Sequence, residues 1–323
     1  MNALDVITGP AKRALDRADC LDWLAALPAD SVDLVFGSPP YRDARTYGID
    51  FKLKGQAWVD WMVAVYQACL RICKGLVAFV VEGNTKRFAY TAEPVLLAAD
   101  LHRAGITLRK PPVFRRVGIP GSGGPDFLRN DYEFIVCATR GGKLPWSENT
   151  ACGHPPRWAP GGAMSHRLSD GARVNKWGGS GKATFRKRDG TTERQSGEAS
   201  QLGTLTRRAT SGAANGDTVN GDGYKPPKLA NPGNVITCKV GGGLMGSPLA
   251  HLNEAPFPEA LSDFFVRSFC PPGGVVADPF VGSGTTGASA LAWGRRFIGC
   301  DVRQSQVDLA ERRLSTVTPM MFV

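Results

Sequence analysis

One stretch near the carboxyl end decides the fold of this chain: Val275-Val276-Ala277-Asp278-Pro279-Phe280-Val281-Gly282-Ser283-Gly284-Thr285-Thr286. Its first four residues predict a short buried strand, and the glycines predict a turn that opens a helix over 285–293. A second apolar strand at 296–301 follows and ends in Asp301. Strand, glycine-rich turn, helix and strand in this order indicate a mostly parallel α/β sheet.

The glycine-rich turn also predicts a site for a small molecule. Glycines allow the backbone to approach a ligand closely, and a helix N-terminus offers free N–H groups to an anionic group. Asp301, at the end of the next strand, is placed to accept hydrogen bonds from ribose hydroxyls. The spacing is neither the GxGxxG of dinucleotide sites nor the lysine-containing loop of nucleoside triphosphate sites. A nucleoside with a short zwitterionic tail remains, and S-adenosylmethionine has that structure.

Residues 1–140 and 251–323 continue this alternation of strand and helix patterns. Runs of apolar residues predict strands, and apolar residues three or four positions apart predict helices. The expected fold class is α/β with a mostly parallel, doubly wound sheet. The further predicted strands are 31–36, 76–81 and 132–138, and the further predicted helices are 58–72, 91–104 and 305–314.

Residues 141–250 have a different composition. Glycine is dense, long apolar runs are absent, and 15 Lys and Arg stand against 7 Asp and Glu. Most of the chain's net charge of +10 therefore lies in this segment. We interpret 141–250 as an irregular insertion between two α/β segments, 1–140 and 251–323, that orders on a polyanionic partner.

A second motif, Ser38-Pro39-Pro40-Tyr41, directly follows the predicted strand 31–36. The two prolines immobilise the backbone and lack N–H groups, so the carbonyls are expected to point outward as rigid acceptors. A hydroxyl, a fixed carbonyl and an aromatic face then come together at the carboxyl end of a strand, where ligands bind in open α/β sheets.

Together, the two motifs resemble the β-class amino-group DNA methyltransferases. In that family the S-adenosylmethionine loop lies near the C-terminus and the catalytic tetrapeptide near the N-terminus, which is the circularly permuted order seen here. The resemblance implies a Rossmann-like methyltransferase fold and activity on double-stranded DNA. It covers about 1–140 and 251–323, and includes Asp19-Cys20-Leu21, Ala255-Pro256-Phe257-Pro258-Glu259 and Phe297-Ile298-Gly299-Cys300-Asp301.

The resemblance also implies a role for individual residues around S-adenosylmethionine. The methionine part and the sulfonium would be held by Asp278, Phe280, Gly282, Ser283, Gly284 and Thr285. Asp301 would bind the ribose, Asp19 and Cys20 would contact the adenine, and Phe257 would close the pocket beside the cofactor.

The tetrapeptide suggests how an exocyclic amine could be made reactive. The lone pair of such an amine is delocalised into the base ring. If Ser38 Oγ and the Pro39 carbonyl accept its two hydrogens, the lone pair localises and can attack the sulfonium methyl group. The target base must leave the duplex, and Tyr41 would stack on it with about 1–3 kcal/mol. This route needs no nucleophilic cysteine.

The base and the DNA contacts follow from the same resemblance. Serine in the first position of the tetrapeptide favours cytosine-N4 methylation, whereas adenine-N6 enzymes mostly carry Asp or Asn there. Both bases stay open, because Ser, Asn and Asp all accept hydrogen bonds. The insertion occupies the family's target-recognition position, where phosphate contacts are expected from Arg186, Lys187, Arg188, Arg207 and Arg208.

Other functions on the same fold stay open. The remaining alternatives are an RNA or protein methyltransferase on the same fold, and a catalytically inactive nucleic-acid-binding protein.

No apolar run reaches membrane-span length and no signal peptide is evident, so a cytoplasmic protein is expected. The eight cysteines lack zinc-site spacing, which predicts reduced thiols and no metal. A cognate restriction endonuclease would be a partner in restriction–modification, with the chain as monomer or homodimer.

Overall fold

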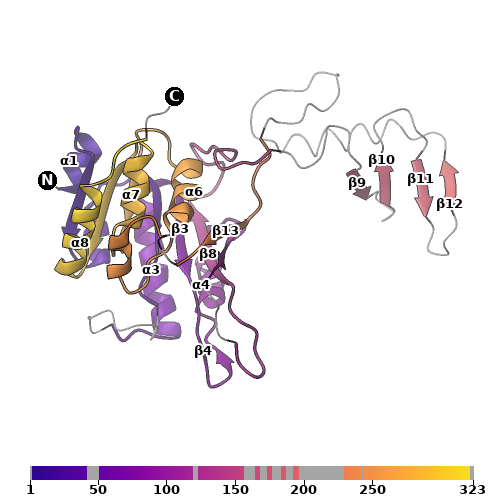
Figure 1. Ribbon diagram of the computed structural model, residues 1–323, viewed down its shortest axis with the longest axis horizontal. Coiled ribbons are helices and arrows are strands. Elements are labelled where there is room, and N and C mark those ends of the chain that lie inside the picture. Colours follow the sequence, from indigo (N-terminus) through magenta and orange to yellow (C-terminus); the bar gives the residue numbers. More distant parts are fainter. Residues whose placement is uncertain are drawn as a thin grey trace. The chain divides into compact units, whose positions relative to one another are not determined.

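The computed structural model describes residues 2–41, 51–118, 123–155, 164–167, 173–176, 183–186, 192–195, 229–241, 243 and 245–320. The chain divides into two compact units (Figure 1). The core unit comprises Met1–Cys152 and Asn231–Val323, and the insert unit comprises Gly153–Ala230.

The core unit is built, within the described residues, on a nine-stranded sheet in the order β1-β15-β14-β2-β3-β8-β7-β13, with β6 paired to β8. Neighbours from β1 to β3 are all parallel, β8 is antiparallel to β3 and β7, and β13 is parallel to β7. The mostly parallel sheet predicted from the sequence is therefore confirmed. The strands are β1 (Arg13–Arg17), β2 (Val32–Gly37), β3 (Cys73–Val81), β6 (Thr107–Leu108), β7 (Val113–Val117), β8 (Tyr132–Thr139), β13 (Val235–Lys239), β14 (Val275–Asp278) and β15 (Arg296–Asp301).

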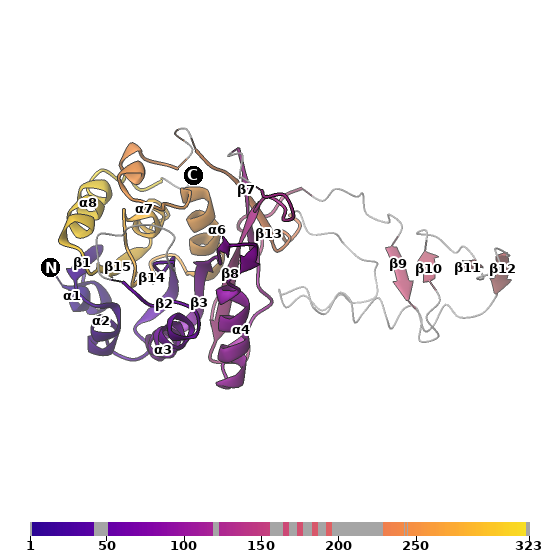
Figure 2. The same cartoon turned by 90° about the horizontal axis from the view of Figure 1, so that it is seen from below.

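Helices cover both faces of this sheet (Figure 2). One face carries α1, α2, α3 and α4, and the other carries α6, α7 and α8. The predicted doubly wound arrangement is thus present. The helices are α1 (Ala3–Thr8), α2 (Cys20–Ala26), α3 (Gln56–Ile72), α4 (Glu93–Arg103), the 3-10 helix η1 (Pro248–Leu252), α6 (Glu259–Phe269), α7 (Thr285–Ala292) and α8 (Gln304–Leu314).

The central strands explain why two helical layers are needed. Successive side chains of a strand point to opposite faces. In β2, Val35 belongs to the core beneath α1–α4, whereas Leu34 and Phe36 belong to the core beneath α6–α8. All three are fully buried. A strand that is apolar on both faces requires cover on both, as parallel sheets generally do.

The insert unit contains two antiparallel strand pairs, β9–β10 and β11–β12. Their bounds are β9 (Met164–Arg167), β10 (Arg173–Lys176), β11 (Ala183–Arg186) and β12 (Thr192–Gln195). The composition of 141–250 gave no sign of these pairs. The strand β13 also lies within 141–250, yet it belongs to the core sheet through its parallel pairing with β7. Across the described part of the chain, no helix is long and apolar enough to span a membrane.

Candidate active site

The register of two central strands brings the two sequence motifs together. The strands β14 and β2 run parallel, with Val276 opposite Leu34 and Ala277 opposite Val35. Asp278 and Gly37 therefore end their strands at the same edge of the sheet. They are so close that a Cβ atom added to Gly37 would lie 2.3 Å from Asp278 Oδ1. The glycine loop and the proline turn start from this shared edge.

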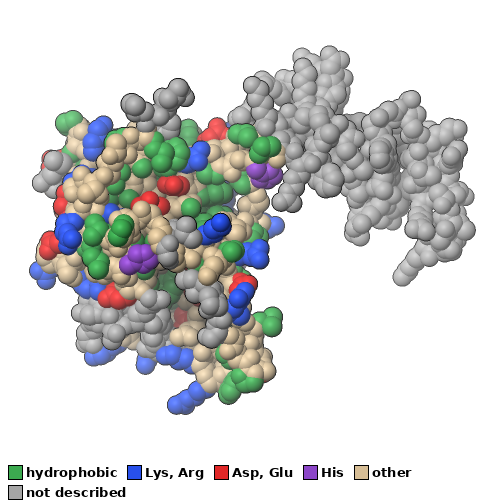
Figure 3. Space-filling view, viewed as in Figure 1, with side chains coloured by type: hydrophobic (Ala, Val, Ile, Leu, Met, Phe, Trp, Pro, Cys, Tyr) green, Lys and Arg blue, Asp and Glu red, His purple; other side chains and the backbone are tan. Residues whose placement is uncertain are grey.

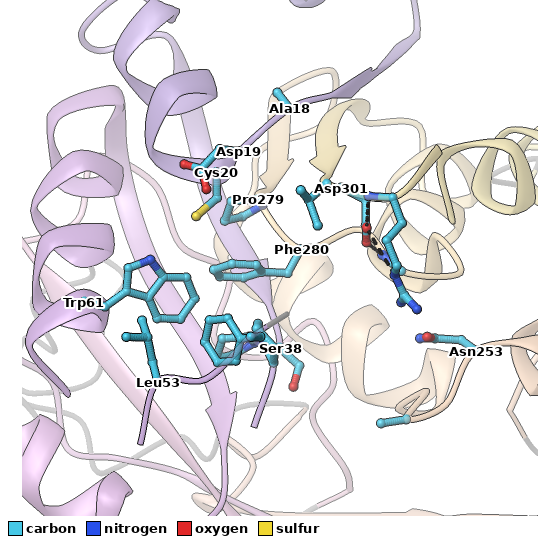
Figure 4. Close-up of a pocket in the computed structure, with 17 residues that line it drawn as sticks. Ala18, Asp19, Cys20, Ser38, Leu53, Trp61, Asn253, Pro279, Phe280 and Asp301 are labelled. Carbon is cyan, nitrogen blue, oxygen red and sulfur yellow. Dashed lines mark hydrogen bonds and ion pairs between the residues drawn. The ribbon is translucent and has the colours of Figure 1, made fainter. Parts of the chain in front are cut away.

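A cavity of about 450 Å³ opens at this edge (Figure 4). Its volume lies within the usual range for small-molecule sites. Most of its lining residues lie at or just after the carboxyl ends of β1, β15, β14 and β2. Of the predicted site residues, it brings together Asp19, Cys20, Ser38, Pro39, Pro40, Phe280, Gly282 and Asp301. The lining also includes residues to which the sequence motifs gave no role in the site: Ala18, Phe51, Leu53, Trp61, Asn253, Ala255, Pro279, Val302 and Arg303.

Asp301 fixes the polar side of the cavity. Its Oδ2 accepts a hydrogen bond from the Gly282 N–H (3.1 Å), and its Oδ1 accepts one from the Arg303 N–H (2.9 Å). Gly282 adopts φ 50°, a left-handed conformation that favours glycine. The Arg303 guanidinium in turn binds both carboxylate oxygens of Glu254 (2.9 and 3.2 Å). Burial raises the pKa of Asp301 above its ordinary value, and the two backbone N–H groups and Arg303 counteract that rise.

Aromatic rings form the opposite wall. The centre of the Phe280 ring lies 5.7 Å from the ring centre of Trp61 and 5.6 Å from that of Phe79. The ring centres of Trp61 and Phe51 are 5.2 Å apart. Figure 4 shows Trp61, Leu53 and Phe280 on one side of the cavity and Asp301 on the other. Flat apolar faces on one side and a carboxylate on the other suit a nucleoside, which has an aromatic base and a hydroxylated sugar.

Asp19 and Cys20 begin α2 at the rim. Asp19 Oδ1 accepts hydrogen bonds from the N–H groups of Leu21 (2.8 Å) and Asp22 (3.4 Å), so this carboxylate caps the helix. Burial, and secondarily the Asp19 charge, raise the pKa of the Cys20 thiol to about 12. Cys20 therefore contributes a neutral thiol to the cavity wall.

Other predicted residues support the cavity from outside its lining. Ser283 and Thr285 turn their hydroxyls toward Arg313, whose side chain is only 1% exposed and lies 3.2 and 3.0 Å from them. Arg313 also binds Glu259 (2.7 Å), which ties the glycine loop to α6. Gly284 is the N-cap residue of α7 and adopts φ 79°. The Phe257 ring packs edge-on against the Phe36 ring, with 5.6 Å between the ring centres.

Asp278 is buried beneath the glycine loop. Its Oδ1 accepts a hydrogen bond from the Phe280 N–H (2.9 Å). Burial raises the pKa of Asp278 to about 7, and the nearby Asp301 carboxylate adds to that rise. A cation bound in the adjoining cavity would favour the ionised form and lower this pKa.

The raised pKa of Asp278 predicts a pH-dependent stability in the absence of ligand. The unfolded chain releases this proton near pH 4, whereas the folded chain keeps it up to about pH 7. The folded state binds more protons in between, so Asp278 lowers the free energy of unfolding as pH rises from about 4 to about 7. We expect Asp278→Asn to remove this decline, measured by urea unfolding at about pH 5 and about pH 8. If the free energy of unfolding depended on pH equally in the wild type and the variant, the raised pKa of Asp278 would be contradicted.

Hydrogen bonds hold the proline turn in place. The Ser38 hydroxyl lies 3.1 Å from the Val80 carbonyl and 3.2 Å from Tyr41 Oη. The Tyr41 hydroxyl donates to Glu133 Oε2 (2.9 Å), and Glu133 pairs with Arg116 at 3.2 Å. The single hydroxyl hydrogen of Ser38 is therefore used within the protein, and its lone pairs remain to accept a hydrogen bond.

A tryptophan secures the second proline of the turn. Trp58 Nε1 on α3 donates to the Pro40 carbonyl at 2.9 Å. Trp58 is 2% exposed, so this bond is anchored in the core. The sequence placed Trp58 only on the apolar face of a helix and gave no sign of this contact.

The five predicted DNA contacts all fall within the sequence bounds of the insert unit. Arg186 is the last residue of β11. Lys187, Arg188, Arg207 and Arg208 lie outside the described residues. Contacts of these five residues with phosphates stay a prediction.

Comparisons with known proteins give a matching family and several similar proteins. A family model described as DNA methylase (N6_N4_Mtase) matches residues 32–312. The DNA adenine methyltransferase YhdJ of Escherichia coli (strain K12) is 24% identical over 315 residues, which cover 96% of this chain and 85% of the relative. The type II methyltransferase M.HinfI of Haemophilus influenzae is 47% identical over 62 residues, 19% of this chain and 17% of the relative.

Solved structures show the same fold at low sequence identity. The PvuII DNA methyltransferase (cytosine-N4-specific) superposes with a TM-score of 0.60 at 16% identity, over 94% of this chain and 86% of that protein. The protein TTHA0409 from Thermus thermophilus, complexed with S-adenosyl-L-methionine, gives a TM-score of 0.53 at 19% identity, over 96% of both chains.

Proposed function

Because the chain belongs to the DNA methylase family whose model matches residues 32–312, we propose that it methylates the exocyclic N4 amine of cytosine within a short DNA sequence. The methyl donor of this family is S-adenosylmethionine. One observation carries the proposal. The parallel pairing of β14 with β2 brings the glycine loop and the proline turn to a single cavity.

The residues around the cavity fit S-adenosylmethionine. Asp301 would bind the ribose, the Asp19–Cys20 rim would contact the adenine, and the backbone at Gly282 would hold the methionine part. Phe280, which the sequence motif assigned to the methionine part, lies in the aromatic wall with Trp61, and we now assign it to the adenine instead. Bound S-adenosylmethionine supplies an activated methyl group on a positively charged sulfonium. The carboxylate of Asp278, buried beneath the glycine loop, would supply the negative charge that complements the sulfonium.

The proline turn would orient the amine of the target base. Ser38 can face it only as an acceptor, because its hydrogen is bound within the protein. The Pro39 carbonyl would accept the second hydrogen of the amine. Two acceptors aimed at the two amine hydrogens localise the nitrogen lone pair by orientation and fixed dipoles. Tyr41, anchored through its hydroxyl, would stack on the base once it has left the duplex.

Cytosine is proposed over adenine because Ser38 occupies the first position of the turn. The similar PvuII enzyme is named cytosine-N4-specific, which supports this choice. The relative from Escherichia coli is named an adenine methyltransferase, so N6 methylation of adenine is the second candidate.

The chain's segments have distinct parts in this proposal. Residues 1–140 would form the catalytic half and 251–323 the cofactor-binding half, in a circularly permuted order. Target recognition would lie in 141–250, which contains most of the excess positive charge. Methylation of a fixed sequence would protect DNA from a restriction endonuclease of the same specificity.

Nucleoside analysis tests the proposal. DNA from a methylation-free bacterial strain that expresses the chain is digested to nucleosides and analysed by mass spectrometry. We expect N4-methylcytosine, at a much lower level in cells that express Ser38→Ala. N6-methyladenine instead would overturn the choice of base, and no methylated nucleoside would overturn DNA methylation itself. Methylation-sensitive sequencing of the same DNA then maps the recognition site.

A further inference from the structure

A small hairpin leaves the sheet beside the proline turn. Its strands are β4 (Thr85–Lys86) and β5 (Ala89–Tyr90), and they are paired with Lys86 opposite Ala89. Arg87 and Phe88 form the two-residue turn, with φ of 48° and 65°. Turns with two left-handed residues favour Asn-Gly, because a side chain in this conformation is strained. Arg-Phe is therefore not a pair that the turn itself requires, and such strain often accompanies function.

The turn presents an aromatic ring to solvent. Phe88 is 68% exposed and follows the exposed Arg87. In Figure 1 the hairpin, marked by β4, projects from the body of the core unit. In Figure 3 the same projection carries hydrophobic and Lys or Arg side chains at its end. An exposed ring beside a cation matches the stacking and phosphate-binding groups that nucleic-acid-binding proteins use.

The base of the hairpin is fixed next to the site. The hairpin follows β3, whose Val80 carbonyl contacts the Ser38 hydroxyl. Tyr90 donates to Glu82 Oε1 (3.3 Å), and a Cβ on Gly83 would lie 2.6 Å from the Tyr90 ring. The base closes with two further bonds of 2.9 Å, from the Asn84 N–H to Thr91 Oγ1 and from the Thr91 N–H to the Asn84 carbonyl. The base of the hairpin is thus fixed next to the strand end that contacts Ser38, and Phe88 lies at the hairpin tip.

A second apolar tip lies near the hairpin. The loop between β7 and β8 carries Leu128, which is 94% exposed. Two residues later, the Asn130 side chain lies close enough to Glu82, at the hairpin base, to counteract in part the rise in the Glu82 pKa that burial causes. Two projections with exposed apolar side chains, at Phe88 and Leu128, therefore approach each other at Glu82, the residue that follows β3.

We propose that the β4–β5 hairpin inserts into double-stranded DNA beside the extruded base, with the Phe88 ring stacked in the space that the base leaves. Arg87 binds a flanking phosphate. This inference rests on the proposed function, because a base must leave the duplex to reach the cavity. Apolar side chains that enter base steps stabilise such opened duplexes.

Two DNA substrates test the role of Phe88. Both are oligonucleotide duplexes with the mapped recognition site, and in one of them the position opposite the target base is abasic. We expect Phe88→Ala to lower kcat/KM on the intact duplex by about 10- to 100-fold. On the abasic duplex the loss should shrink to less than about threefold, because an unpaired base leaves the stack more easily.

A double variant separates DNA insertion from hairpin stability. Arg87→Asn with Phe88→Gly provides the pair that the turn favours, so the hairpin is retained while the ring is lost. It should lose at least as much activity on the intact duplex as Phe88→Ala, whereas Phe88→Trp should keep most of it. Leu4→Ala, at a 46% exposed position on α1, is the matched control and should have no effect.

Several outcomes would overturn the insertion. They are wild-type activity of Phe88→Ala on the intact duplex, equal losses on both duplexes, or full activity of the double variant. A wild-type protein that methylates neither duplex would instead defeat the proposed function, and the hairpin inference with it.

Discussion

Replacing Ser38 by alanine is expected to lower kcat for methyl transfer by about 10²- to 10³-fold, with S-adenosylmethionine affinity changed less than about twofold. The hydroxyl is one of the two acceptors proposed for the amine, and a single aimed dipole in a closed site has an effect of this size. Ser38 also lines the cavity, but the wall that would hold the nucleoside is made by Phe280 and Asp301. The loss should therefore fall on the chemical step.

Single-turnover kinetics and calorimetric titration measure these two quantities separately. Ser315→Ala is the matched control, because Ser315 is an exposed serine directly after α8, far along the chain from the proline turn. A wild-type rate in Ser38→Ala would contradict the proposed acceptor. A large parallel loss of cofactor affinity would show that Ser38 shapes the cavity instead.

The second large effect is expected at Gly37, where alanine should disrupt the site. Its Cβ would lie 2.3 Å from Asp278 Oδ1 and 2.9 Å from Cγ. Both residues end strands in the middle of a buried sheet, so neither can move without displacing a motif. We expect the free energy of unfolding to fall by about 2–3 kcal/mol. Methylation should fall by at least about 10²-fold, since small displacements of reacting groups have effects of this size.

Chemical denaturation and methylation assays of Gly37→Ala check both expectations. Gly233→Ala is the matched control, because a Cβ at Gly233 would meet nothing within 4 Å. The account of the shared edge fails if Gly37→Ala unfolds and methylates as the wild type does.

The sequence allowed the centre of the fold to be predicted because the central strands are apolar on both faces. Every residue of β14 is buried, and β3 has one exposed residue in nine. The edge strands were missed for the opposite reason. The strand β1 reads Arg-Ala-Leu-Asp-Arg with one buried residue, and β13 alternates exposed and buried positions within a glycine-rich segment. Pairing with neighbours, rather than composition, makes these segments strands.

The candidate site could be predicted only as far as its two motifs. Both appear in the sequence as continuous runs with unusual backbone requirements. The residues that secure them come from distant positions. Trp58 reaches Pro40, Glu133 reaches Tyr41 across 92 positions, and Arg313 reaches the glycine loop across 28 to 30. A buried arginine on an amphipathic helix has the same local pattern as a surface arginine, so only tertiary packing distinguishes them.

The pairing of β2 with β14 also affects how the protein is made. The Val275 N–H reaches Asp33 Oδ2 across 242 positions, so the middle of the sheet joins segments that leave the ribosome far apart in time. Until the later segment emerges, β2 has an apolar edge without its partner, which favours aggregation and contact with chaperones. Such long-range pairing also slows folding. A nascent chain that stops before β14 would thus carry the proline turn without the glycine loop beside it.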